Sequence, residues 1–111
     1  MRTTESAVRI QIFVGEDDLW HHKPVHHEIV RRARESGLAG ATVVRGCEGF
    51  GDHSVIHTNR LLDLTEDLPV VVTIVDIEER IQNFLPRLDD VIADGTVVID
   101  EVRVIRYRGR S

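Results

Sequence analysis

The chain has 111 residues, which is enough for one domain with a single hydrophobic core. Its 14 Lys and Arg residues and 19 Asp and Glu residues give a net charge of −5, so a broad basic face for nucleic acid is not expected. The N-terminal residues lack the pattern of a signal peptide, and no apolar run approaches the about 20 residues that a membrane span needs. Together with a single cysteine, Cys47, these observations predict a cytoplasmic protein in which that thiol is buried.

The first half of the chain predicts a strand, a helix and a second strand. Apolar residues alternate over residues 7–14, as in a half-buried strand. Apolar residues then recur at helical spacing from Pro24, which suits a first turn, to Gly37, which suits the position just past a helix. Residues 41–47 are predicted to form the second strand.

The second half begins with residues 69–76, which are apolar on both faces, as is typical of a central strand covered on both sides. Asp76 is predicted to cap a second helix, with Glu79 as its capping-box partner. Pro86 should kink this helix or end its first segment.

The last strand is expected over residues 96–107, with a bulge near Asp100-Glu101 because its apolar parity changes there. The element order is then βαββαβ, which predicts an α+β, ferredoxin-like fold with an antiparallel sheet and two helices on one face. The other face would carry Phe13, Val71 and Val75 with nothing left to cover them. A single layer of helices cannot dry both faces, so we expect a homo-oligomer that packs sheets together.

The connection between the second and third strands, residues 47–68, is long for a loop in a compact domain, and such loops are usually functional. Its base holds three closely spaced glycines, Gly46, Gly49 and Gly51. Their backbone N–H groups can hold an anion while Arg45 and Arg60 neutralise its charge. The spacing is neither a Walker A motif nor a dinucleotide fingerprint, because it lies between two strands. Glycines needed only to turn the chain remain an equal alternative.

Arginines also gather at the C-terminus, where Arg106, Arg108 and Arg110 share one parity. In an extended segment they would line one side and could clamp a phosphate across a subunit boundary. A solvated basic tail is the alternative.

Four of the six histidines lie between His21 and His27. His22 and His26 are four residues apart, a spacing that can hold one metal ion on a helix. Glu16, Asp17 and Asp18 could complete such a site. A surface segment with ordinary histidines is the alternative. No triad of nucleophile, base and orienting residue is evident, so we do not expect an enzyme; an enzyme would have to use His53 or His57 as a base.

Residues 37–46, followed by Glu48-Gly49-Phe50-Gly51, resemble the DUF190 family, which belongs to the PII-like signalling proteins. Gly15-Glu16, residues 68–72 and Val75-Asp76 support the resemblance, which covers about residues 8–105.

The resemblance implies a single ferredoxin-like domain over residues 1–111 that forms a homotrimer, is not an enzyme and requires no cofactor. In PII-like proteins a small anionic effector, often an adenine nucleotide, binds in clefts between subunits, and the loop after the second strand contacts a partner protein. An adenine nucleotide effector and an unidentified partner, such as a membrane transporter, are therefore expected here. The residues implied for the ligand site are Arg45, Gly46, Glu48, Gly49, Phe50, Gly51, Arg60, Asp94, Gly95, Arg103 and Arg106.

Where the family commonly has Gly-Lys-Pro-Leu-Tyr, this chain has His22-Lys23-Pro24-Val25-His26. Copper-tolerance proteins of the CutA type resemble the same trimeric fold. A metal-binding trimer that uses His22 and His26 is therefore the alternative function.

Overall fold

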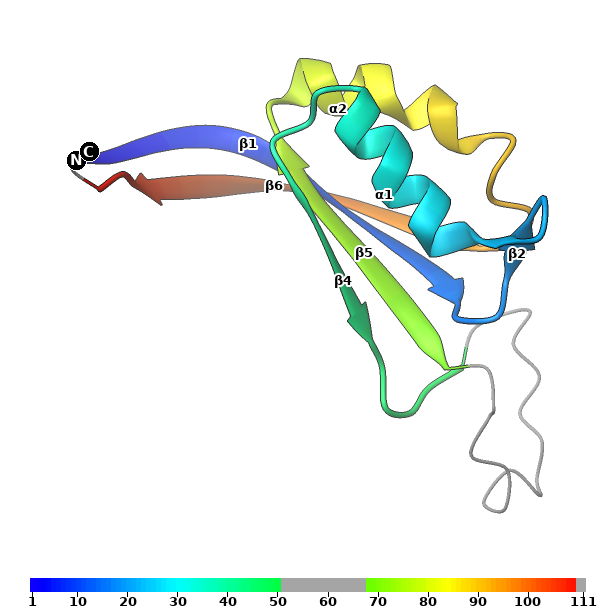
Figure 1. Ribbon diagram of the computed structural model, residues 1–111. Helices are drawn as coiled ribbons and strands as arrows, with labels where there is room; N and C mark the ends of the chain where they lie inside the picture. The colour runs from blue at the N-terminus through cyan, green and yellow to red at the C-terminus, as the bar shows by residue number, and fades with distance from the viewer. Residues whose placement is uncertain (51–67, 110–111) are drawn as a thin grey trace.

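The computed structural model describes residues 1–50 and 68–109, which form a four-stranded antiparallel sheet with two helices on one face (Figure 1). The strands are β1 (Arg2–Gly15), β4 (Ala41–Arg45), β5 (Pro69–Asp76) and β6 (Thr96–Tyr107), in the order β4-β5-β1-β6. The helices are α1 (Val25–Glu35) and α2 (Glu78–Phe84), and α2 continues into a 3-10 turn, η2 (Leu85–Leu88). A short hairpin of β2 (Leu19–Trp20) and β3 (Lys23–Pro24) precedes α1. This architecture confirms the predicted α+β, ferredoxin-like fold.

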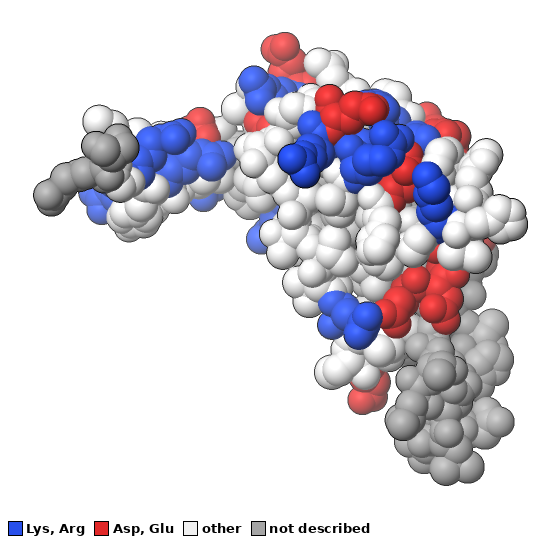
Figure 2. Space-filling model, viewed as in Figure 1, with Lys and Arg blue, Asp and Glu red and all other residues white. Residues whose placement is uncertain are grey.

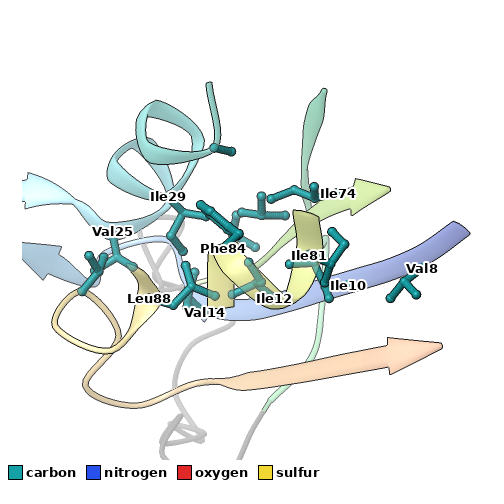
Figure 3. Packing of buried hydrophobic residues seen from close by; sticks show 14 residues of the cluster. Val8, Ile10, Ile12, Val14, Val25, Ile29, Ile74, Ile81, Phe84 and Leu88 are labelled. Atoms are coloured by element: carbon teal, nitrogen blue, oxygen red, sulfur yellow. The ribbon is translucent and has the colours of Figure 1, made fainter. Parts of the chain in front are cut away.

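The hydrophobic core lies between the helices and one face of the sheet (Figure 3). Every second residue of β1 from Val8 to Val14 is buried, as the alternation in the sequence predicts. Ile29 of α1 and Ile81 and Phe84 of α2 pack against this row, each at most 1% exposed. No helix in the described part of the chain is both long and apolar enough to cross a membrane.

The opposite face of the sheet carries apolar side chains that no described residue covers. Phe13 lies directly opposite Val71 in the β1–β5 register, so both project from this face. Phe13 is 38% exposed, and Val44 and Val98, on the same face, are 55% and 43% exposed. The prediction of an apolar, uncovered sheet face is therefore confirmed. β5 is an interior strand, as predicted, but only one of its faces is covered within the protomer.

Beyond the body of the sheet, β1 and β6 continue as a two-stranded ribbon of residues 2–7 and 102–107 (Figure 1). β5 pairs with β1 only from Val8 onward, so the ribbon has no third strand. The first strand was expected to begin only at Ala7, because residues 2–6 are polar and lack the apolar alternation that marks a strand.

The bulge expected near Asp100-Glu101 is wrong, because the register between β1 and β6 runs unbroken from Thr96 to Tyr107. The apolar residues of β6 instead move from one face of the strand to the other, because different faces are covered in the sheet and in the ribbon. Ile99 lies opposite Ile10 on the face that the helices cover, whereas Val102 lies opposite Ala7 on the other face, in the ribbon.

The start of α2 also differs from the prediction. Its N-cap is Ile77, with no side-chain cap, so the capping box of Asp76 and Glu79 is wrong. The buried Asp76 carboxylate accepts hydrogen bonds from the backbone N–H groups of Ala39, at 2.9 Å, and Ile77, at 2.7 Å. It therefore ties the α1–β4 connection to the end of β5. Pro86 lies in η2, directly after α2, which confirms that it ends the first helical segment.

The β2–β3 hairpin turns through His21 and His22, whose φ angles are +49° and +68°. Two consecutive residues with positive φ are the mark of a type I′ turn, which prefers Asn-Gly. Positive φ is uncommon for any residue other than glycine, so the turn was not evident from the sequence. Trp20 anchors the hairpin, with the Arg32 guanidinium 4.9 Å from the centre of its ring.

Replacing this pair by His21→Asn with His22→Gly should stabilise the protein by about 1 kcal/mol, because it removes the strain of two left-handed residues. The urea midpoint at fixed protein concentration measures the change. The opposite substitution, His22→Val, should destabilise the protein, since a β-branched residue tolerates positive φ worst. Equal midpoints for the two variants would show that the turn does not have this geometry.

Candidate functional site

All four strands of the sheet begin or end at one end of it, where several of the predicted ligand residues lie. β1 ends at Gly15 opposite the first residue of β5, Pro69, and β4 ends at Arg45 opposite Val70. β6 begins nearby, with Thr96 opposite Phe13. The base of segment 47–68 and the Asp94-Gly95 turn therefore lie at the same end of the sheet. We call this region the sheet end.

Arg45 forms an ion pair with Glu16, the residue that follows β1. The Glu16 backbone N–H also donates a 2.8 Å hydrogen bond to the carbonyl oxygen of Leu68. Glu16 therefore contacts residues near both ends of segment 47–68, Arg45 before it and Leu68 at its close. Because the Arg45 side chain is 64% exposed, its ion pair contributes little stability and leaves the guanidinium accessible to an anion.

Gly46 is held close to Pro69, and its backbone N–H donates a 2.7 Å hydrogen bond to the Pro69 carbonyl oxygen. A Cβ atom at this position would lie 2.8 Å from Pro69 Cγ and 3.3 Å from that carbonyl oxygen. The close approach of β4 and β5 at the sheet end therefore requires a glycine.

Gly46→Ala should force β4 and β5 apart at the sheet end and cost about 1–3 kcal/mol of stability. Amide hydrogen exchange should accelerate most at Gly46 and Glu16, whose N–H groups bridge the strands. Gly40→Ala is the matched control, because a Cβ there meets no atom within 4 Å. Equal exchange rates and equal stabilities in the two variants would contradict the structural role of Gly46.

The two turns beside Gly46 are held by hydrogen bonds and by packing. The Gly15 N–H donates to the Asp18 carboxylate at 2.8 Å, and the Val25 N–H donates to the Asp18 carbonyl oxygen at 2.9 Å, so β1 and α1 are fixed together. At Gly95, a Cβ atom would lie 2.9 Å from Ile92 Cγ2 and 3.0 Å from the Phe13 carbonyl oxygen. The second predicted loop therefore sits directly on β1.

The other ligand residues predicted in segment 47–68 are either exposed or lie outside the described residues. Glu48, Gly49 and Phe50 are exposed, and the Phe50 side chain is 72% exposed. Gly51 and Arg60 lie outside the described residues, as do His53 and His57. Cys47 is exposed, so the expectation of a buried thiol is wrong; it follows the end of β4, where the sheet no longer covers it.

Arg103 and Arg106 lie on the ribbon, away from the sheet end of their own protomer. They pair with Ser6 and Thr3 of β1, whereas the level of Arg45 along the sheet corresponds to Val14. Val14 is eight residues beyond Ser6, which corresponds to roughly 26 Å along the strand. Arg106 also bonds Glu5 at 3.0 Å. Within one protomer these arginines and Arg45 do not form one site, so only a second subunit could bring them together.

The histidines do not share a helix face. α1 begins at Val25, so His22 lies in the hairpin turn and only His26 and His27 are helical. In the described parts of the chain, residues 1–50 and 68–109, no group of three or more His, Cys, Asp or Glu side chains could hold a metal ion. The helical spacing that suggested a metal site is therefore absent.

The architecture is that of the PII-like proteins. CPII from Thiomonas intermedia K12, a nitrogen regulatory PII-like protein solved with bound ADP, AMP and bicarbonate, superposes with a TM-score of 0.67. The two chains are 18% identical, and the match covers 92% of this chain and 91% of CPII. At that identity the likeness shows the fold alone.

The chain belongs to the DUF190 family, whose model, described as "Uncharacterized ACR", matches residues 7–104. A UPF0166 protein of Aquifex aeolicus is 38% identical over 96 residues, which cover 86% of this chain and 90% of the relative. A UPF0166 protein of Methanocaldococcus jannaschii is 32% identical over 103 residues, covering 92% and 93%. These matches confirm the family to which the sequence pattern pointed.

Proposed function

We propose that this protein is a PII-like regulatory subunit that binds an adenine nucleotide in clefts between the subunits of a homotrimer. The observation that carries the proposal is the sheet end, where exposed Arg45, the glycine contact at Gly46 and the Gly95 turn converge at the base of segment 47–68. An anion that recruits Arg45 must compete with Glu16, which also contacts Leu68. Nucleotide binding would thereby change the arrangement of both ends of that segment.

The homotrimer is supported by surfaces that a single protomer leaves open. The apolar sheet face around Phe13 and Val98 is uncovered, and the edge strand β6 has a free edge among the described residues. An isolated two-stranded ribbon is marginally stable in water, so the ribbon also favours a neighbouring subunit as support. A neighbour could then present Arg103 and Arg106 to the sheet end.

In this proposal the protein acts in the cytoplasm by binding rather than by catalysis. A nucleotide changes the affinity for a protein partner, such as a membrane transporter or an enzyme, only if it binds two arrangements of segment 47–68 with different affinity. CPII, solved with ADP and AMP, supports an adenine nucleotide as the effector to test first. The proposal assigns no metal, because His22 and His26 do not share a helix face.

The test combines light scattering, to measure the mass of the assembly, with calorimetric titration of ATP, ADP and AMP. We expect a mass of three 12.6 kDa chains and saturable binding of at least one nucleotide. Arg45→Ala should weaken binding at least tenfold, which corresponds to about 1.4 kcal/mol. Arg80→Ala, on α2 near Gly37 and away from the sheet end, is the control and should bind as the unsubstituted protein does. A stable trimer that binds none of the three nucleotides would refute the effector, and a monomer would refute the site between subunits.

A further inference from the structure

A groove runs between α1 and the free edge of β4, on the face of the sheet that the helices cover. Its wider part is a hollow of about 470 Å³, within the range of small-molecule pockets. The residues that line it are His26, His27, Val30, Arg31, Arg34 and Val43. A second hollow of about 250 Å³ shares Val30 and Arg34 and continues to the α1–β4 connection at residues 38–41. The groove is therefore elongated.

The two ends of the groove differ in chemistry. The wider hollow combines two imidazoles and two guanidinium groups with apolar surface from Val30 and Val43. Apart from Arg34, the narrower hollow is lined by apolar side chains and by the backbone of Gly40. A ligand that fits both hollows therefore has one polar end and one apolar end.

Arg34 is the cation best placed to meet the polar end of such a ligand. Arg31 already bonds the carboxylates of Glu28, at 2.6 Å, and Glu35, at 3.1 Å. The guanidinium of Arg34 has no ion pair or hydrogen bond with any described residue, although it lines both hollows. One uncommitted cation suits a ligand with one negative charge better than a polyphosphate.

His26 supplies a second polar group at the same end. Its Nδ1 atom is buried and has no hydrogen-bond partner among the described residues. Burial, and next the neighbouring His27, lower the pKa of His26 below its ordinary value. Because the imidazolium would carry an unpaired N–H on the buried Nδ1, the neutral ring is favoured, and its Nε2–H tautomer can donate a hydrogen bond to a ligand.

We propose that the α1–β4 groove is a binding site for a small amphipathic organic anion with one carboxylate and an apolar body. Arg34 and His26 would hold the carboxylate, and the body would lie over Val30 and extend to the narrower hollow. The site is separate from the nucleotide site proposed at the sheet end. It borders that site, however, because His26 is close enough to Glu16 and Arg45 to feel both charges.

Octanoate is a suitable probe, because it has one carboxylate and a flexible apolar chain. Binding is followed in the assembled protein by the imidazole ¹⁵N signals, with those of His26 assigned by their loss in His26→Gln. We expect a saturable change at His26 with octanoate. Acetate, which lacks the body, and octylammonium, which reverses the charge, should bind at least tenfold more weakly.

Arg34→Glu should weaken octanoate binding at least tenfold, whereas Arg80→Glu, the same change on α2 away from the groove, should leave it unaltered. Both variants must first show an unchanged assembly mass. Equal affinity of Arg34→Glu, equal binding of octylammonium, or a change that never saturates would each overturn the proposal. Arg34→Glu should still bind nucleotide. Failure of the groove proposal can therefore be told apart from failure of the proposed nucleotide binding.

Discussion

Arg32→Met should destabilise the protein by about 3 kcal/mol, because removing one partner of a buried ion pair leaves an uncompensated charge. Arg32 bonds Glu28 at 2.8 Å and Asp90 at 2.6 Å, and a further bond to the Arg87 carbonyl oxygen joins α1 to η2. The Glu28 side chain is only 2% exposed. Urea unfolding at one protein concentration measures the loss.

Arg31→Met is the matched control, because Arg31 bonds the same carboxylate but is 54% exposed. We expect it to cost about 1 kcal/mol, as is typical of an exposed pair. If Arg31→Met were as destabilising as Arg32→Met, the hydrogen bonds to Glu28, and not the burial of Arg32, would account for the effect.

The protein should also lose stability in acid, because the Glu28 carboxylate becomes protonated there. Hydrogen bonds from Arg31, and then from Arg32, lower the pKa of Glu28 from 4.5 to about 2, although burial opposes them. A depressed folded-state pKa stabilises the protein above the unfolded-state pKa, and this contribution is lost as the pH falls from about 5 toward 2. The acid dependence should flatten in Glu28→Gln, while a curve identical to that of the unsubstituted protein would contradict it.

Phe84→Ala should cost about 3–5 kcal/mol, the usual effect of removing a phenyl ring from a packed core. Phe84 is 1% exposed and packs with Ile29 and Ile81 between the helices and the sheet (Figure 3). Thermal and urea unfolding at fixed concentration both report the change.

Ile77→Ala removes a smaller apolar group at the start of α2, where Ile77 is 42% exposed. Its cost should stay below about 1 kcal/mol, because little apolar area leaves the water there on folding. Comparable losses for Phe84→Ala and Ile77→Ala would mean that α2 docks differently.

The interior of the fold could be predicted from the sequence, because apolar residues alternate along β1 and form a nearly continuous run in β5. The prediction for residues 69–76 matches β5 at both ends. Gly37, with φ of +78°, ends α1 as expected, because glycine adopts this conformation without strain. Errors appeared where tertiary context overrides local signals. The buried Asp76 bonds Ala39, far along the chain, in preference to capping α2.

The candidate site was predictable only in part for the same reason. Gly46 and Gly95 could be predicted as site residues, because the chain packs so closely there that a side chain would clash. The pairing of Arg45 with Glu16 joins residues that are far apart in the sequence, and no pattern announces it. The C-terminal arginines were expected beside the same cleft, but their strand register carries them along the ribbon.

Charged side chains also show why a net charge says little about a surface. Figure 2 shows Lys and Arg gathered along the ribbon, whereas over the helices they are interleaved with Asp and Glu. The Arg31–Glu28 and Arg87–Glu35 pairs, at 2.6 Å each, account for part of this pattern. The net charge of −5 therefore conceals a locally basic arm.

The pairing of β1 with β6 holds Met1 and Arg108 together at the ribbon tip. The Met1 ammonium donates to the Arg108 carbonyl oxygen at 2.9 Å, and the Arg108 N–H donates to the Met1 carbonyl oxygen at 2.8 Å. A linker of a few residues could therefore join residues 1 and 109 without disturbing the sheet, and the chain could be opened elsewhere as a circular permutant. The exposed Gly40, where added atoms meet nothing within 4 Å, is a natural place for the new ends.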